Sequence, residues 1–159
     1  MDGDVHVMAP QQTFEDLSHP SVCDFAEDGF RKRHQGARVL VVEDDAGCRL
    51  VAEELLTPTG LHLEFADDGL QAVELARHTR YDLIAMDLSL PALNGIDAAR
   101  QIRAMPGRRR TPIVAVTANV LPLTRQECLQ AGITEFVYKP YTAGGLLLTV
   151  LKCLDQVRV

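Results

Sequence analysis

The sequence predicts an α/β fold in which a five-stranded parallel sheet lies between two layers of helices. Five short apolar runs of strand length alternate with five longer stretches in which apolar residues recur at helical spacing. The run at 81–91, YDLIAMDLSLP, is apolar on both sides of its pleat, which is typical of a strand buried in a parallel sheet. Right-handed crossovers between such strands would place helices on both faces, giving a three-layer sandwich.

The predicted elements follow one another from residue 37 to the end of the chain. Turn residues separate them: Pro58 and Gly60 stop the first helix, and Asn94-Gly95 follows the third strand. Strands are expected at 38–42, 61–66, within 81–91, at 112–116 and at 135–138. Helices are expected at 46–57, 67–79, 96–105, 124–131 and 142–157.

The composition favours one globular domain and excludes several classes of protein. A chain of 159 residues with 47% hydrophobic residues has room for one domain with a packed core and a tail. A net charge of −6 argues against direct nucleic-acid binding, which relies on an excess of Lys and Arg. The four cysteines lack metal-ligand spacing and are interpreted as reduced thiols, and the five histidines as surface residues. No apolar run is long enough to cross a bilayer, so no membrane contact and a cytoplasmic location are expected.

Residues 1–36 differ from the rest and are assigned to an N-terminal tail, with the domain at 37–159. Seven acids precede the basic run Arg31-Lys32-Arg33-His34, and apolar residues are too sparse for a separate core. A disordered or loosely ordered, solvated tail is expected. The alternative is a short helix, around 13–17 or 22–30, that docks on another part of the molecule.

The last helix has an apolar side wider than one buried stripe needs. Its apolar residues spread over roughly 160° at 100° per residue. Core packing explains most of this width, and the surplus is a candidate surface for a partner or a dimer. The residues are Leu146, Leu147, Val150, Leu151, Cys153, Leu154 and Val157.

Reactive side chains follow four of the five predicted strands. Asp87 ends the third strand, and the first strand delivers the acids 43–45. The fourth strand delivers Thr117 and the fifth delivers Lys139. In an open α/β sheet, ligands bind beyond the carboxyl ends of the strands. An acid cluster, a hydroxyl and an ammonium group are therefore expected at one edge of the sheet.

These residues stand in four motifs whose order resembles the receiver domain of two-component response regulators. The motifs are VVEDD, MDLSLPALNG, VAVTAN and FVYKP, and the resemblance extends from about 37 to 157. TPIVAVTANVL and EFVYKP look most like the receivers of hybrid histidine kinases. The resemblance implies a flavodoxin-like receiver fold with strand order 2-1-3-4-5.

The resemblance also implies a role for each site residue. Asp87 would be the phosphoacceptor, Thr117 the switch hydroxyl and Lys139 the charge partner. Phe136 would be the switch aromatic, and the Lys139-Pro140 peptide bond would be cis. Small polar side chains at Ser89 and Asn119 would line the water path and tune the lifetime of the aspartyl phosphate.

A divalent cation suits the acid cluster, because gathered carboxylates repel one another until a hard cation relieves the repulsion. Mg²⁺ is expected, with Mn²⁺ as a second possibility, since it prefers a few carboxylates, retained waters and a phosphate oxygen. Asp44, Asp87 and the main-chain carbonyl of Ser89 are the expected direct ligands, with Glu43 acting through water.

The implied function is a stand-alone response regulator or an element of a phosphorelay. The donor would be a phosphohistidine of a histidine kinase or of a histidine phosphotransfer protein, and the downstream protein target is unknown. Phosphorylation would repack the face made by the helix at 124–131, the strand at 135–138 and the last helix, through which the chain could form a homodimer. The protein would catalyse its own phosphorylation and dephosphorylation, and would not be an enzyme that turns over a separate substrate.

Two alternatives stay open. The first alternative is a phosphatase with an aspartate nucleophile. Such phosphatases typically carry the motif Asp-x-Asp followed by Gly-Thr, whereas Asp87 is followed by Leu88-Ser89-Leu90-Pro91. Turnover of a simple phosphate ester would distinguish this class. The other alternative is a receiver-like scaffold that binds partners without phosphorylation. The intact acids and Lys139 argue against it, and labelling with a small phosphodonor would decide.

Overall fold

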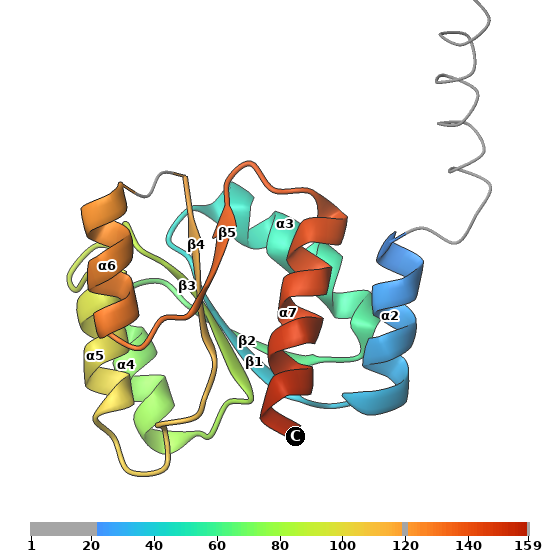
Figure 1. The fold of residues 1–159 in the computed structure, drawn as a ribbon, viewed down its shortest axis with the longest axis horizontal. Coiled ribbons are helices and arrows are strands. Elements are labelled where there is room, and N and C mark those ends of the chain that lie inside the picture. The colour runs from blue at the N-terminus through green and yellow to red at the C-terminus, as the bar shows by residue number, and fades with distance from the viewer. Residues whose placement is uncertain (1–21, 119–120, 159) are drawn as a thin grey trace, which may run out of the picture.

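The computed structural model describes residues 22–118 and 121–158. Its centre is a five-stranded parallel sheet with the order β2-β1-β3-β4-β5, which confirms the predicted fold class and strand order (Figure 1). The strands are β1 (Arg38–Val42), β2 (His62–Ala66), β3 (Leu83–Asp87), β4 (Ile113–Thr117) and β5 (Glu135–Tyr138). Residues 1–21 and Asn119 lie outside the described residues, so the expectations for the start of the tail and for Asn119 remain predictions.

Helices cover both faces of the sheet, as the alternation of apolar runs predicted. They are α2 (Val22–Arg33), α3 (Ala46–Leu56), the short 3₁₀ helix η1 (Thr57–Thr59), α4 (Gly69–His78), α5 (Gly95–Arg103), α6 (Pro122–Gln130) and α7 (Ala143–Arg158). Helices α4, α5 and α6 pack on one face, and α3 and α7 on the other (Figure 1). Within the described part of the chain, no helix combines the length and the apolar character needed to span a membrane.

The two faces share the buried strands through the two-residue period of β structure. In β1, Leu40 and Val42 enter the core under α4, α5 and α6, whereas Val39 and Val41 enter the core under α3 and α7. All five residues of β3 are buried. Asp87 therefore ends a strand that is apolar on both sides, as the sequence indicated.

Helix α2 occupies part of the stretch assigned to the tail, and corresponds to the docked helix that the sequence left open. Ala26 and Phe30 are fully buried in the same core as α7. At the far end of α2, Arg33 and His34 both contact the carboxylate of Asp155, with His34 Nε2 lying 2.6 Å from Oδ1. The assignment of His34 to the surface was wrong, because the residue is buried beside Ala37, Asp82 and Leu154.

The apolar width of α7 is explained largely by this docking. Of the apolar residues that the sequence singled out on α7, all but Val157 are buried, and they share a core with Ala26 and Phe30 of α2. The surplus apolar surface of α7, which suggested a partner, is thus covered in part by helix α2 of the same chain.

The four cysteines are free thiols, as predicted.

Phe30→Ala is expected to undock α2 without unfolding the sheet. Removing a fully buried phenylalanine costs about 3–5 kcal/mol, and here the loss cannot exceed the free energy that holds α2 on α7. Amide hydrogen exchange should therefore rise throughout α2, while β1 and β3 keep their protection. Phe25→Ala is the matched control, because Phe25 lies on the same helix and is 67% exposed. Equal protection of α2 in the two variants would contradict this account of docking.

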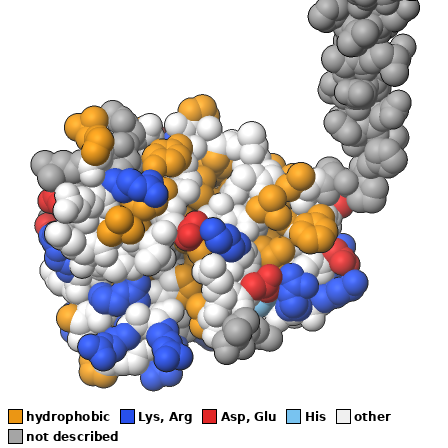
Figure 2. Space-filling view, viewed as in Figure 1, with side chains coloured by type: hydrophobic (Ala, Val, Ile, Leu, Met, Phe, Trp, Pro, Cys, Tyr) orange, Lys and Arg blue, Asp and Glu red, His pale blue; other side chains and the backbone are white. Residues whose placement is uncertain are grey.

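Arg103 ties together three segments at the end of the sheet opposite Asp87. Its guanidinium donates hydrogen bonds of 2.7–2.9 Å to four main-chain carbonyls, and burial lowers its pKa. The acceptors are the carbonyl oxygens of Arg108, Arg109, Thr111 and Gly132. The loop before β4 and the turn before β5 are therefore held to the end of α5. Figure 2 shows Lys and Arg side chains gathered at this lower end of the molecule.

Candidate functional site

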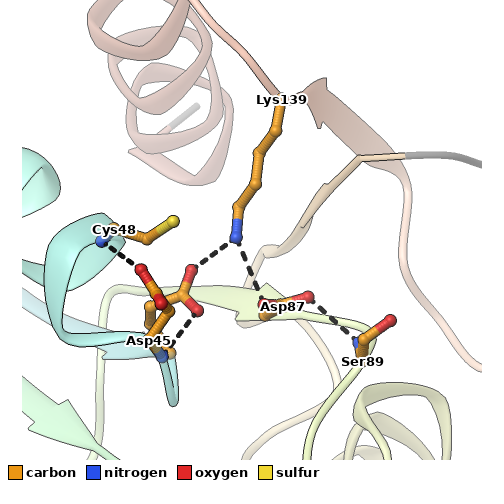
Figure 3. Close-up of polar contacts among 6 residues, drawn as sticks. Asp45, Cys48, Asp87, Ser89 and Lys139 are labelled. Carbon is orange, nitrogen blue, oxygen red and sulfur yellow. Dashed lines mark hydrogen bonds and ion pairs between the residues drawn. The ribbon is translucent and has the colours of Figure 1, made fainter.

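The carboxyl ends of β1, β3, β4 and β5 bring together the side chains that the sequence singled out. Asp87 ends β3, and Glu43 and Asp44 follow β1, which is paired with β3. Lys139 follows β5, and its side chain reaches across to Glu43 and Asp87 (Figure 3). Its Nζ donates to Oε1 of Glu43 at 2.6 Å and to Oδ2 of Asp87 at 3.2 Å. The amine and the acids meet at one edge of the sheet.

Main-chain contacts fix the position of Asp87. A side chain at Gly95 would collide with the carbonyl oxygen of Asp87, so the start of α5 can approach this strand end only with glycine. Asn94 caps α5 by accepting a hydrogen bond from the N–H of Asp97 at 2.9 Å. The Asn94-Gly95 pair, which the sequence identified only as turn chemistry, thus places a helix directly against the backbone of the candidate phosphoacceptor.

Glu43 is held by both its backbone and its side chain. Its N–H donates to the carbonyl of Ala66 at 3.0 Å, which extends the pairing of β1 with β2. Burial raises the pKa of the Glu43 carboxyl above its ordinary value, although the hydrogen bond from Lys139 opposes this shift.

Burial alone would lower the pKa of Lys139, but the hydrogen bond to Glu43 and the charge of Asp87 raise it. Lys139 is therefore a cation under physiological conditions.

The residues present fit a divalent cation. Carboxylate oxygens of Glu43, Asp44 and Asp87 all lie within 4.8 Å of one another. One ammonium group cannot balance three carboxylates at such distances, so the site keeps an excess of negative charge. An all-oxygen ligand set, with exposed Asp44 open to water, is what Mg²⁺ prefers.

Asp45 has a different role from its two acidic neighbours. Its carboxylate caps α3 by accepting a hydrogen bond from the N–H of Cys48 at 2.8 Å (Figure 3). This hydrogen bond also lowers the pKa of Asp45. The main-chain N–H of Asp45 donates to Oε2 of Glu43 at 3.2 Å. The structure thus separates a helix cap from the acids that cluster with Asp87.

Ser89 contacts Asp87 through its backbone. The N–H of Ser89 donates to Oδ1 of Asp87 at 3.0 Å, and the Ser89 side chain is exposed. Asp87 therefore has one oxygen turned toward Ser89 and the other toward Lys139. The Ser89 carbonyl as a metal ligand, and the tuning roles of Ser89 and Asn119, stay predictions.

Thr117 and Phe136 lie on the neighbouring strands β4 and β5. Thr117 is buried at the end of β4, and its carbonyl accepts a hydrogen bond of 2.8 Å from the N–H of Lys139. Phe136 is half-buried. The Lys139–Pro140 peptide bond is cis, as predicted.

Arg125 is a feature of this face that the sequence did not reveal. Its guanidinium lies 4.4 Å from the centroid of the Phe136 ring, a cation–π contact. It also donates to the hydroxyl of Tyr138 at 2.9 Å, and the two rings stack with centroids 6.3 Å apart. No local pattern joins α6 to β5, so these contacts could not be found without the fold.

Comparison with known proteins identifies a family model, described as the response regulator receiver domain, that matches residues 39–151. The aerobic respiration control sensor protein ArcB of Escherichia coli K12 is 33% identical over 163 residues, covering 98% of this chain and 21% of that protein. The sensory/regulatory protein RpfC of Xanthomonas campestris is 32% identical over 140 residues, covering 86% of this chain and 19% of that protein. The chain thus spans about a fifth of the length of these curated relatives.

Solved structures agree with this match. The receiver domain of sensor histidine kinase PA1611 of Pseudomonas aeruginosa PAO1 superposes with a TM-score of 0.71 at 40% identity, covering 76% of this chain and 98% of that one. That structure has a magnesium ion coordinated in its active-site cleft. The chemotaxis protein CheY4 of Vibrio cholerae gives a TM-score of 0.71 at 30% identity, covering 74% of this chain and 98% of that one.

Proposed function

The chain belongs to the response regulator receiver domain family, and from this premise we propose that Asp87 accepts a phosphoryl group from a phosphohistidine. The donor is a histidine kinase or a histidine phosphotransfer protein, in keeping with the kinase and sensor proteins among the relatives. The observation that carries the proposal is the contact of Asp87 with the Lys139 ammonium, beside two further carboxylates.

In the proposed transfer, a carboxylate oxygen of Asp87 forms a bond to phosphorus while the bond from phosphorus to the histidine nitrogen breaks. The nitrogen keeps the electron pair and leaves as neutral imidazole after protonation. Such transfers depend mostly on alignment and charge neutralisation. Lys139 contributes a fixed positive charge beside the accepting oxygen. Mg²⁺, with Mn²⁺ as a substitute, would neutralise charge on the phosphoryl group when held by Asp44, Asp87, the Ser89 carbonyl and, through water, Glu43.

The phosphorylated aspartate would change the face made by α6, β5 and α7. Phosphorylation adds negative charge and strong acceptor oxygens beside Thr117. The Thr117 hydroxyl would turn toward a phosphoryl oxygen and make room for Phe136 to move inward. The contact with Arg125 bears on this step, because inward movement of Phe136 has to break or carry along the cation–π pair. This face would bind the downstream protein or a second copy of the chain.

The remaining expectations fit this proposal. The protein acts in the cytoplasm as a phosphoacceptor and does not turn over a separate substrate. The scaffold alternative gives no role to an ammonium group held between Glu43 and Asp87. The phosphatase alternative needs a second acid two residues after the nucleophile, and Ser89 stands there.

Incubation with acetyl phosphate and Mg²⁺ tests the proposal. Intact-mass spectrometry is expected to show a single phosphoryl adduct that hydroxylamine removes, because hydroxylamine cleaves acyl phosphates. A parallel sample with EDTA in place of Mg²⁺ is expected to show little adduct. An adduct that resists hydroxylamine, or no adduct with Mg²⁺ present, would overturn the assignment of an aspartyl phosphate. Steady release of phosphate from a simple phosphate ester would favour the phosphatase.

A further inference from the structure

Helices α2 and α7 run parallel and in register along their whole contact. Val22 lies against Gly144, Gly29 against Leu151, and Arg33 is paired with Asp155. The members of each pair are 122 residues apart, so α2 follows α7 from its first turn to its last (Figure 1). The receiver family model begins at residue 39, after α2. This helix is therefore an addition to the part of the chain that the family model covers.

The first turn of α7 is intrinsically weak. It contains Gly144 and Gly145, and glycine weakens a helix more than any residue except proline. Thr142 supports this turn from within the chain, since its hydroxyl accepts from the N–H of Gly145 at 2.9 Å. Its carbonyl accepts from the N–H of Leu146 at 3.1 Å. Leu146 and Leu147 are buried against the sheet, but the two glycines before them add no side chains, so contacts from another element bear on this part of the turn.

Val22 supplies that packing from the first turn of α2. A Cβ atom at position 144 would lie 3.0 Å from Cγ1 of Val22, so one methyl group of the valine covers the glycine, while the residue as a whole stays 53% exposed. The far end of α2 is fixed by buried Phe30 and by the pairing of Arg33 with Asp155. Because the rest of α2 is held on α7 by these contacts, Val22 contacts the weak turn from a supported helix.

This turn is joined to the site by a short connection. Only Pro140 and Tyr141 separate Lys139 from the capping residue Thr142. Tyr141 is half-buried against the core that α2 and α7 share. The N–H of Lys139 is in turn bonded to the carbonyl of Thr117. A displacement of the first turn of α7 therefore acts on the backbone that carries the ammonium group.

We propose that Val22 is a positioning residue, which holds the first turn of α7 and through it places Lys139 beside Asp87. The consequence for phosphoryl transfer rests on the function proposed above for Lys139. The packing and its effect on the Lys139 backbone do not depend on that function and are measured separately.

Val22→Ala tests the packing. Amide exchange of Lys139, Gly145 and Leu146 is expected to rise roughly fivefold, since local opening of this turn becomes easier. Labelling by acetyl phosphate at saturating Mg²⁺ is expected to slow about threefold, because misplaced catalytic groups lose rate. Phe25→Ala, on the same helix, removes an apolar side chain that is also exposed, 67% against 53% for Val22, but has no atom within 4 Å of a Cβ at position 144, and it should change neither quantity.

Gly144→Ala supplies the rescue. In the Val22→Ala background the new methyl group has the space that the valine left, and alanine strengthens the turn. Both exchange and labelling should return close to the wild-type values. In the wild-type background the same methyl group would lie 3.0 Å from Cγ1 of Val22, so it should lower exchange less than it does in the Val22→Ala background. An effect of Gly144→Ala that depends on residue 22 cannot come from helix propensity alone.

The outcomes separate the two proposals. Unchanged exchange in Val22→Ala, or a rise at Gly145 and Leu146 without a rise at Lys139, overturns the positioning role. A rise at all three amides with unchanged labelling also overturns it, because Lys139 is then placed without Val22. If the wild type takes no label, the proposed function fails, and the exchange of the three amides alone decides whether Val22 positions this segment.

Discussion

Replacing Asp87 by asparagine is expected to abolish the phosphoryl adduct formed with acetyl phosphate and Mg²⁺. The amide keeps the shape of the side chain and can accept one of the two hydrogen bonds that the carboxylate accepts, from Ser89 and from Lys139, but its oxygen is a poor nucleophile toward phosphorus. It also removes one of three carboxylates that lie within 4.8 Å of one another, so Mg²⁺ affinity should fall as well. Intact-mass spectrometry measures the adduct, and isothermal titration measures binding of Mg²⁺.

Asp45→Asn is the matched control for this variant. It makes the same chemical change two residues after Glu43, where the side chain caps α3, and asparagine caps helices as well as aspartate does. The control should fold and take the label as the wild type does. A full adduct in Asp87→Asn, mapped by peptide analysis to another acid, would refute the assignment of the phosphoacceptor.

Lys139→Met is expected to slow labelling by about 100-fold, the loss typical of removing one preorganised charge from a transfer site. It should also reduce stability by about 3 kcal/mol at neutral pH without Mg²⁺, because Glu43 is buried and loses its ion pair. Added Mg²⁺ should restore part of this stability, since the cation takes over the neutralisation of the acids. Urea unfolding with and without Mg²⁺ measures both effects.

The pH dependence of this loss has a definite sign. The folded pKa of Glu43 already lies above its ordinary value, and removing the ammonium would raise it further. The destabilisation of Lys139→Met should thus be complete above the folded pKa of Glu43 in the variant. It should shrink as the pH falls toward the pKa of the unfolded state, about 4.5. Lys152→Met is the control, because Lys152 is exposed and its partner Glu135 is only half-buried, and ion pairs at the surface contribute at most about 1 kcal/mol. A Lys139→Met variant as stable as this control would contradict the role of the ion pair.

Local patterns in the sequence were sufficient for the sheet and for the edge at which the site lies. The period of β1 and β3, and the turn residues between elements, are properties of short segments, and an acid at a strand end is visible without the fold. The bounds differ by only a few residues: α6, for example, begins at Pro122 and not at Thr124, because proline suits the first turn of a helix.

What the sequence did not reveal depends on contacts between distant segments. The apolar residues before residue 37, Phe30 among them, seemed too sparse for a core because the other half of the core that Phe30 enters belongs to α7. His34 was assigned to the surface for the same reason. The sequence alone also cannot tell that Asp45 caps a helix while Asp44 joins the cluster, since the three acids after β1 are consecutive and only the fold orients them.

The hydrogen bonds of Arg103 have a consequence for how the domain can move. They pin the entry of β4 and the turn before β5 to the end of α5, whereas Thr117 and Lys139 stand at the opposite ends of these strands. A strand that is fixed at one end is displaced least at that end and most at the other. Rearrangement of β4 and β5 is therefore expected to be small near Arg103 and largest at Thr117 and Lys139, where a modified Asp87 would act.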